Sequence, residues 1–509
     1  MALLFAAARA NSGLASTYTM PRPSVTSGQE VAEHNPFDLA PSIYLNPFYN
    51  DQLLRTKNND TDDYGIKCAI DQMMGMPSAV WLDSTASLTG NYSLAATTLA
   101  SAANHTDPPL VVFIVYNLPN RDCHAKASLG ELCCTYSVNT SSHCNFTAPG
   151  ECKDGLDDYR TKYIDRLVAW LQKFSTVPVV TVIEPDSLPN LATNMDDIKC
   201  GSNATQNSYK KGVAYAVESL AKARRKLTGA ARVDVYMDAA HGAWLGWDNN
   251  RDAITTIIKD LNVTRFIRGF ATNVANYNSI GIQCGRGVDC KLGPFSSDPC
   301  CEDPCGLLDQ WNRANNELNY VTLLGETMRA SIEGFDPHFL IDSGRNGNSY
   351  ARSSCGSWCN VRHAGAGYAP TLSTGNTSLV DAYFWFKTPG ESDGCTKSLP
   401  TDKDSYSKGE LCPRYDTDCG EDDSIGSRNG TEPFAPEAGA WFSYQVQQLA
   451  ANAKLFDYNY SFNCTTPIPT GAPTSSLDSP SPSPSPSPTP APTTLADSPS
   501  LPPSSNPTF

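Results

Sequence analysis

Charged and amide side chains follow several short apolar runs of this chain, at the points where buried strands would end. The apolar run 179–183 is followed directly by Glu184 and Asp186, and the run 111–116 leads to Asp122. In an α/β barrel, parallel strands deliver catalytic side chains at their C-terminal ends. These carboxylates are therefore candidates for acid–base chemistry at the mouth of a barrel.

Four further apolar runs follow the same pattern. They span 233–237, 266–270, 339–341 and 383–386, and they deliver Asp238, Asn273, Asn276, Asp342, Arg345, Lys387, Glu391 and Asp393. Stretches with the helical spacing of apolar residues lie at 159–174, 209–227, 312–332 and 436–455. The alternation predicts an α/β fold of the TIM type, a parallel sheet closed or nearly closed into a (β/α) barrel.

The composition limits the partners of the chain. Its 509 residues, of which 40% are hydrophobic, are enough for one large catalytic domain with extended loops. The formal net charge is −15, the pI is about 4.9, and Lys and Arg form no basic stripe. We therefore expect neither nucleic acid nor a membrane as partner. We also expect a monomer that needs no metal or cofactor.

Cysteines and glycosylation sequons indicate secretion. The chain has 18 cysteines and eleven Asn-X-Ser/Thr sequons, which is typical of an oxidising, glycosylating route. Residues 1–34 resemble a signal peptide and leader, although their start carries no basic residue and their apolar core is short. The catalytic domain is expected at 35–464, followed by a Pro/Ser/Thr-rich tail at 465–509 that cannot bury a core.

Two insertions, 133–152 and 284–305, are dense in cysteine. A zinc site is the alternative to disulfides in such loops. Because His is nearly absent from both insertions and the other signals are secretory, we expect disulfides that hold the loops in shape.

Three carboxylates have the positions that glycosidic bond cleavage requires. That reaction needs a proton donor for the leaving oxygen and a second carboxylate for water or nucleophilic attack. Asp122, Asp186 and Asp393 each come just after a predicted strand. Any one of them alone could instead cap a helix or pair with Arg121 or Lys387. Their shared position at strand ends favours the catalytic interpretation.

Aromatic residues supply the second half of the pattern. Trp81, Trp244, Trp247 and Trp358, with Tyr116, lie in predicted loops or at strand ends. Sugar rings present flat C–H faces that pack on indoles while their hydroxyls form hydrogen bonds, so these residues favour a polysaccharide ligand. The tryptophans inside apolar runs are expected in the core; they are Trp170, Trp385 and Trp441.

Seven segments of the chain, taken in their order along the sequence, resemble the motifs of a known family. They span 116–123, 182–188, 238–247, 268–277, 342–347, 358–360 and 387–394. In this order they resemble the motifs of glycoside hydrolase family 6, and the resemblance covers roughly residues 35 to 460. It implies an inverting β-1,4-glucanase or cellobiohydrolase on a distorted α/β barrel.

The resemblance also implies roles for individual residues. Asp186 matches the general acid, and Asp122 matches the carboxylate that keeps this acid protonated and stabilises the transition state. Tyr116 matches a tyrosine that crowds the distorted sugar ring, and Ser128 matches a serine that orders the attacking water. Asp393 matches the proposed base, which acts through a water chain in the family and whose role is disputed.

Further positions are implied for the substrate and for disulfides. Sugar platforms or substrate-binding positions correspond to Trp81, His241, Trp244, Trp247, Asn276, Trp358, Lys387 and Glu391. Family disulfides correspond to Cys123 with Cys200 and Cys359 with Cys419. The chain departs from the family pattern at Asn117, Asn120 and Ser392, where two aspartates and a cysteine are common. None of these departures affects the proton donor.

The loop 387–436 bears on the mode of action. It is long and carries Cys395, Cys412 and Cys419, so it resembles the roof of a tunnel. We therefore expect release of cellobiose from non-reducing chain ends, with an endo-β-1,4-glucanase as the alternative. A glucan-binding wall protein without catalysis would lack one of the carboxylates Asp122 and Asp186, and both are present. A surface adhesin is compatible with the tail but not required by it.

Overall fold

The computed structural model describes residues 16–23, 32–137, 140–224, 232–292, 296–396, 412–428 and 431–455. The tail 465–509 and most of the leader 1–34 lie outside the described residues. The same holds for the middle of the predicted tunnel roof, at 397–411. The domain boundaries at these points stay predictions.

Seven parallel strands form the central sheet. They are β3 (Val80–Leu82), β4 (Val111–Val115), β7 (Val179–Ile183), β8 (Val233–Asp238), β9 (Gly269–Thr272), β10 (His338–Asp342) and β11 (Val380–Phe384). Their order is β11-β10-β9-β8-β7-β4-β3, and every neighbouring pair is parallel. All C-terminal ends therefore meet at one edge of the sheet, as the sequence pattern predicts.

The two edge strands of this sheet meet at a short seam. An isolated parallel bridge joins Ser78 to Trp385, and the N–H of Ala79 donates to the carbonyl of Trp385 at 2.9 Å. The indole N–H of Trp81 donates to the carbonyl of Phe386 at 2.8 Å across the same seam. The seam converts the curled sheet into a barrel but lacks a full ladder, so the prediction of a distorted barrel is confirmed.

Alternate residues of the strands face two different cores. Val112, Ile114, Val180 and Val182 belong to one buried cluster, whereas Val111, Phe113, Val179 and Ile183 belong to another. Because side chains alternate along a strand, the first set faces the barrel interior and the second faces the helices. Burial on both faces explains why these strands are continuous Val- and Ile-rich runs.

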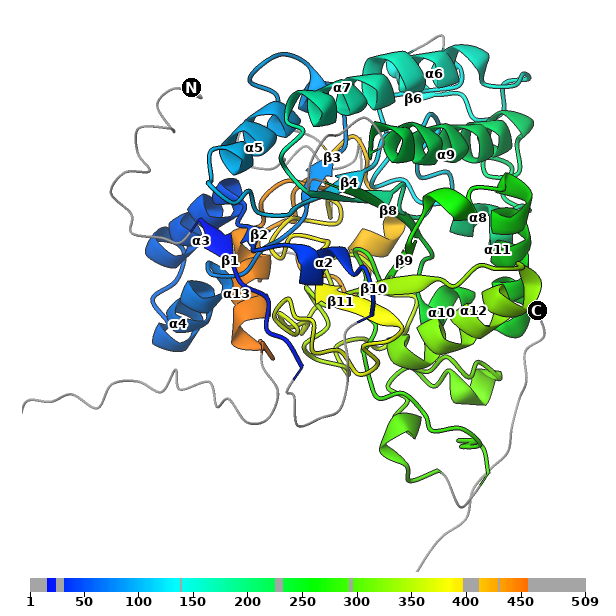
Figure 1. Ribbon diagram of the computed structural model, residues 1–509. Helices are drawn as coiled ribbons and strands as arrows, with labels where there is room; N and C mark the ends of the chain where they lie inside the picture. The colour runs from blue at the N-terminus through cyan, green and yellow to red at the C-terminus, as the bar shows by residue number, and fades with distance from the viewer. Residues whose placement is uncertain are drawn as a thin grey trace, which may run out of the picture. The chain divides into compact units, whose positions relative to one another are not determined.

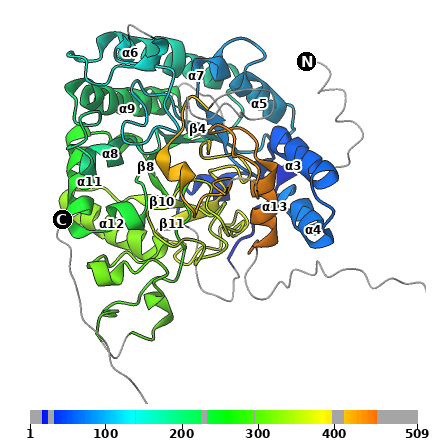
Figure 2. The same cartoon turned by 180° about the vertical axis from the view of Figure 1, so that it is seen from behind.

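Helices surround the strands. Figure 1 shows α5 (Leu94–Ala103), α7 (Asp165–Lys173), α9 (Asn203–Arg224), α11 (Asp248–Leu261) and α12 (Glu317–Ser331) along the outside of the sheet. Figure 2 shows the same helices from behind. A second group, α3 (Pro47–Asn59), α4 (Tyr64–Met73) and α13 (Ser443–Ala451), packs together beside the seam. None of the described helices has both the length and the apolar character required to cross a lipid bilayer.

Some predicted elements are shifted. The run 266–270 begins with a 3₁₀ turn at Thr264–Phe266, and the strand follows as β9. The predicted helix 159–174 starts as a π-helical turn at Tyr159–Ile164. The predicted helix 312–332 begins only at Glu317, because the Asn316 side chain accepts from the Asn319 N–H and caps the helix there.

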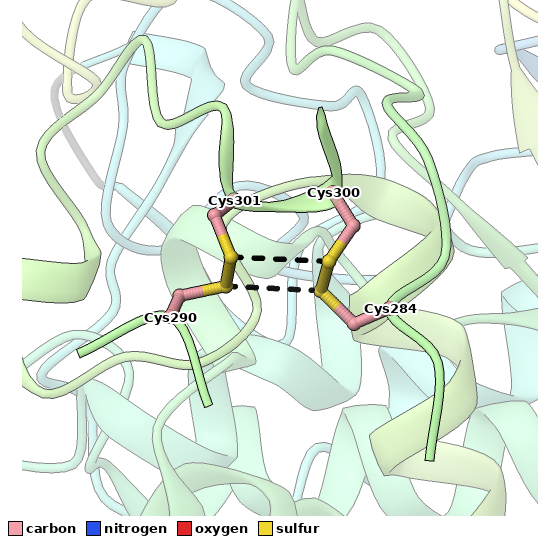
Figure 3. A group of neighbouring side chains, drawn as sticks. All are labelled: Cys284, Cys290, Cys300 and Cys301. Carbon is pink, nitrogen blue, oxygen red and sulfur yellow. Dashed lines mark hydrogen bonds between the residues drawn. A yellow bond between two sulfur atoms is a disulfide. The ribbon is translucent and has the colours of Figure 1, made fainter. Parts of the chain in front are cut away.

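Disulfides hold the long loops. Both implied family bridges are present, Cys123 to Cys200 and Cys359 to Cys419. The insertions contain further bridges, which pair Cys133 with Cys144, Cys134 with Cys152, Cys284 with Cys300, Cys290 with Cys301 and Cys305 with Cys355. Figure 3 shows two of them side by side in the second insertion. The disulfide interpretation of both insertions is confirmed.

Candidate active site

A cavity of about 720 Å³ lies at the C-terminal ends of the strands. Its wall contains every residue that the family resemblance implied for catalysis or substrate binding: Trp81, Tyr116, Asp122, Ser128, Asp186, His241, Trp244, Trp247, Asn276, Trp358, Lys387, Glu391 and Asp393. Residues far apart in the sequence therefore share one chamber, because parallel strands present their loops at the same end.

Asp186 occupies the turn between β7 and the short helix α8 (Ser187–Thr193). Its backbone is left-handed, with φ of 63°, and its N–H donates to Oδ2 of Asp238 at 3.0 Å. Burial raises the pKa of the Asp186 carboxyl well above its usual range, and the nearby charges of Asp238 and Asp122 raise it further. Asp186 is thus suited to hold a proton.

Asp238 ends β8 and is almost fully buried. Its Oδ2 accepts hydrogen bonds from the N–H groups of Asp186 at 3.0 Å and Ala240 at 3.1 Å. Burial raises the pKa of Asp238 as well, but these two N–H groups oppose the rise because they stabilise the carboxylate. Asp238 is therefore the partner that ionises first, which leaves the proton on Asp186.

Asp122 lies in the loop after β4, also with a left-handed backbone. Its Oδ2 accepts from the N–H of Ser128 at 3.0 Å, which brings this serine to the carboxylate. Burial raises the pKa of Asp122. The adjacent Arg121 fixes the loop, because its guanidinium donates to the carbonyls of Ser128 and Asp83 at 2.9 Å and lies over the Tyr116 ring at 4.1 Å.

Asp393 has a different environment. Both of its oxygens accept from Arg345 at 2.8 Å, and Oδ2 also accepts from the Tyr277 hydroxyl at 2.7 Å and the Asn360 N–H at 2.8 Å. The Arg345 side chain is 1% exposed, so this is a buried ion pair. Because these donors already occupy both oxygens, Asp393 offers little room for a direct contact with the attacking water.

The indole N–H of each cavity tryptophan is bonded to the protein. Trp81 donates to the Phe386 carbonyl, Trp244 to Thr193 Oγ1 at 2.7 Å, Trp247 to the Gln310 carbonyl at 2.9 Å and Trp358 to Asp418 Oδ2 at 2.8 Å. The ring planes are therefore fixed before any ligand binds. Of the tryptophans assigned to the core, Trp385 is fully buried, whereas Trp170 and Trp441 pack against the core while partly exposed.

Polar groups lie between these rings. Lys387 Nζ lies 5.3 Å from the Trp81 ring centre and 3.8 Å from Glu391 Oε2. Burial raises the pKa of Glu391 to about 7. The His241 ring contacts the Asn276 amide at 3.0 Å, and burial with the Arg352 charge lowers the pKa of His241 to about 3. This imidazole is therefore neutral, and it can both donate and accept hydrogen bonds.

Several cavity residues were not selected from the sequence. They include Asp83, Arg414 and Asp418. Asp238 and Arg345, which bind Asp186 and Asp393, are not among the lining residues, and the sequence placed them at strand ends without a role. The sequence did contain a signal for Asp238 and Arg345, since both follow predicted strands. It contained none for Asp418, whose contact with Trp358 depends on a loop from a distant part of the chain.

Comparison with known proteins gives a consistent result. Residues 40–453 match the family described as glycosyl hydrolases family 6. The chain is 34% identical to exoglucanase 3 of Agaricus bisporus over 418 residues, which is 81% of this chain and 77% of that protein. It is 34% identical to the probable 1,4-β-D-glucan cellobiohydrolase C of Aspergillus niger over 431 residues, 83% of this chain and 78% of that protein.

A solved structure extends the likeness to the fold. It is cellobiohydrolase II of Humicola insolens in complex with glucose and cellotetraose, with a TM-score of 0.62 and 29% identity. The match covers 82% of this chain and 99% of that one. The family match and the similarity of the fold agree, and the chain belongs to glycosyl hydrolases family 6.

Proposed function

We propose that this chain hydrolyses β-1,4-glucosidic bonds of cellulose with inversion at the anomeric carbon, and that it releases cellobiose from non-reducing chain ends. The observation that carries the proposal is the buried pair Asp186 and Asp238 in a cavity lined by fixed tryptophans. Family membership and the names of the relatives, exoglucanase and cellobiohydrolase, support it.

Asp186 acts as the general acid in this proposal. It gives its proton to the glycosidic oxygen as the bond to the anomeric carbon breaks. The raised pKa of Asp186 favours the protonated form that this role requires. Asp122, which lies close enough to raise that pKa, stabilises the positive charge that develops on the sugar ring.

Water attacks from the opposite face of the ring. We assign Ser128 to ordering this water, since its N–H already binds Asp122. Asp393 receives the proton indirectly, through water, because Arg345 and Tyr277 occupy its oxygens. An inverting enzyme requires at least ~6.5 Å between its acid and base carboxyls. Tyr116 is assigned to crowding the distorted ring.

The aromatic residues form a track for the glucan chain. Trp81, Trp244, Trp247 and Trp358 offer ring faces, whereas His241, Asn276, Lys387 and Glu391 offer hydrogen bonds to hydroxyls. A mixture of apolar faces and fixed polar groups is what binding a sugar polymer requires.

The described part of the loop 387–436 supports enclosure of the chain. Arg414 and Asp418 of this loop line the cavity. The Cys359–Cys419 disulfide and the Asp418 contact with Trp358 attach the loop to the cavity wall. A loop fixed over the cavity favours action at chain ends over internal cutting.

Product analysis on phosphoric-acid-swollen cellulose tests the proposal. We expect cellobiose as the main product, and NMR of fresh product should show the α-anomer first. On carboxymethylcellulose, viscosity should fall slowly relative to reducing-sugar release. Initial β-anomer would refute inversion, and rapid loss of viscosity would favour an endoglucanase.

We further propose that the protein is secreted, N-glycosylated and monomeric. The sequon asparagines that lie on the described surface are exposed at Asn59, Asn91, Asn104, Asn145, Asn203 and Asn262. Enzymatic deglycosylation of the protein made in a eukaryotic host should lower its mass. An unchanged mass would contradict glycosylation, and light scattering of the same sample tests the monomer.

A further inference from the structure

Trp311 is the most exposed large apolar side chain of the described residues, at 79% exposure, and no step above uses it. An exposed indole offers a large flat apolar face on which a ligand ring can stack. Its backbone has a left-handed φ of 61°, which ordinary residues rarely adopt. The surrounding loop must therefore hold Trp311 in place.

The loop that carries Trp311 is bound to the cavity wall on two sides. On one side, the carbonyl of its neighbour Gln310 accepts the indole N–H of Trp247 at 2.9 Å. On the other side, Cys305 is bonded to Cys355, and Cys355 lines the cavity. Trp311 therefore directly follows Gln310, whose carbonyl holds the indole of the cavity residue Trp247.

Further contacts make this loop rigid. Asn312 is fully buried and donates to the Gly242 carbonyl at 2.8 Å, and Arg313 pairs with Asp248 at 3.5 Å. Two adjacent disulfides, Cys284–Cys300 and Cys290–Cys301, brace the start of the insertion (Figure 3). A rigid platform loses little conformational entropy when it binds a ligand.

One face of the Trp311 ring is already covered. Lys291 Nζ lies 3.8 Å from the ring centre, which is close enough for a cation–π contact. The ammonium holds the ring and keeps donors for hydroxyl groups. Asp309, Gln310 and Arg313 beside it are exposed and can also bond hydroxyls. A flat apolar ring with a polar rim matches a pyranose.

We propose that Trp311 with Lys291 forms an additional glucan-binding site outside the cavity, continuous with Trp247, that captures the part of a long β-1,4-glucan chain not yet in the cavity. This inference rests on the proposed function for its ligand class. It differs from the cavity track because neither Trp311 nor Lys291 lines the cavity, so we expect a short oligosaccharide bound in the cavity not to contact it.

The experiment compares long and short ligands. Binding is measured in the Asp186→Asn background, so that cleavage does not consume the ligand, with phosphoric-acid-swollen cellulose and with cellotetraose. Trp311→Ala should weaken binding to swollen cellulose on the order of three- to tenfold, as expected for one lost aromatic contact. Binding to cellotetraose should not change. Trp311→Phe should retain most of the cellulose affinity.

Two further variants control for structure. Trp311→Asn removes the ring but tolerates the left-handed backbone, and it should behave like Trp311→Ala. Tyr64→Ala removes an exposed aromatic ring at the start of α4 and should bind both ligands as the parent does. Unchanged cellulose binding by both Trp311→Ala and Trp311→Asn would overturn the inference. Equal weakening of cellulose and cellotetraose binding would overturn it as well.

The outcome is separable from that of the proposed function. Hydrolysis of swollen cellulose by the unmodified chain tests the activity, whereas the binding experiment uses a variant that needs no activity. Normal hydrolysis together with unchanged binding by the Trp311 variants would overturn only the additional site.

Discussion

At the scale of single residues, Asp186 and Asp393 have different surroundings, and these suit the two carboxyl groups to different chemical roles. Among the residues that the structure describes, no cation pairs with Asp186, and Asp238 and Asp122 lie near it, so burial and repulsion favour its protonated form. Asp393 is paired with Arg345 and accepts two further hydrogen bonds, from the Tyr277 hydroxyl and the Asn360 N–H. Two carboxyls whose environments differ in this way are suited to opposite roles in acid–base catalysis.

Replacement of the proton donor is the direct test of this assignment. Asp186→Asn keeps the size of the side chain but removes its acidic proton, so the activity on cellulose should fall by about 10²–10⁴-fold, the usual contribution of general acid catalysis. Binding of cellotetraose should persist, because the tryptophan track is intact. Near-normal hydrolysis by this variant would mean that another group donates the proton.

The Asp238 carboxylate should control the pH profile. Asp238→Asn removes a negative charge that raises the pKa of Asp186. The pKa of Asp186 should therefore fall, and because the acid must be protonated to act, the loss of kcat/KM with rising pH should begin at a lower pH. The pH–rate profile measures this shift. Asp252→Asn removes an exposed charge on α11 and should leave the profile unchanged.

If Asp238→Asn loses activity equally at every pH, Asp238 only shapes the turn.

The sequence predicted carboxylates at the strand ends but could not predict the pairing of Asp186 with Asp238. Whether Asp238 reaches the Asp186 N–H depends on the left-handed turn after β7. Likewise, the Arg345 pairing with Asp393 joins two loops that are distant in the sequence.

At the scale of elements, the loops that follow the strands contain residues with strained, left-handed backbone conformations. Glu184, Asp186, Asp122, Ala240 and Asn273 all have positive φ just after β7, β4, β8 and β9. Such conformations cost of order 1–3 kcal/mol each and persist where the surrounding structure holds them. Here buried Glu184 contributes, since it accepts from the N–H groups of Asn117 and Leu118 in the neighbouring loop.

The long buried strands were predictable because Val- and Ile-rich runs give a strong signal. The short strand β3 was not, since Val80–Leu82 has only three residues and gains its place from pairing with β4 and from the seam. The π-helical turn at Tyr159–Ile164 was also not predictable, because its apolar spacing is close to that of an α-helix.

The Cys359–Cys419 disulfide should matter for both stability and the site. It closes a sequence separation of 60 residues, so Cys359→Ala with Cys419→Ala should cost about 4 kcal/mol of unfolding free energy. Binding of cellotetraose should also weaken, because Trp358 and Asn360 flank Cys359. Guanidinium unfolding and a binding titration measure the two effects.

The first insertion offers a matched control. Cys133 and Cys144 close a separation of 11 residues, so removing this bridge should cost about 3 kcal/mol, without an effect on cellotetraose binding. Equal binding by both double variants would show that the Cys359–Cys419 bridge does not shape the cavity wall.

At the scale of the whole molecule, buried acidic groups outside the proposed catalytic set affect stability. Glu184, Glu317 and Asp342 are each at most 2% exposed. Burial raises the pKa of Glu184 and of Glu317 to about 7 and that of Asp342 to about 6. In the unfolded chain the same groups titrate near 4. Between these values the folded state binds more protons than the unfolded state.

Stability should therefore fall as the pH rises. The protons held by the folded state favour folding fully below the unfolded pKa values, and this advantage is lost as the pH passes through the folded values of about 6 to 7. The melting temperature should be higher at pH 5 than at pH 8. Glu317→Gln cannot titrate, and its amide keeps an acceptor for the Gly242 N–H, so it should reduce this difference. A melting temperature that rises from pH 5 to pH 8 would mean that these carboxyls do not govern the pH dependence of folding.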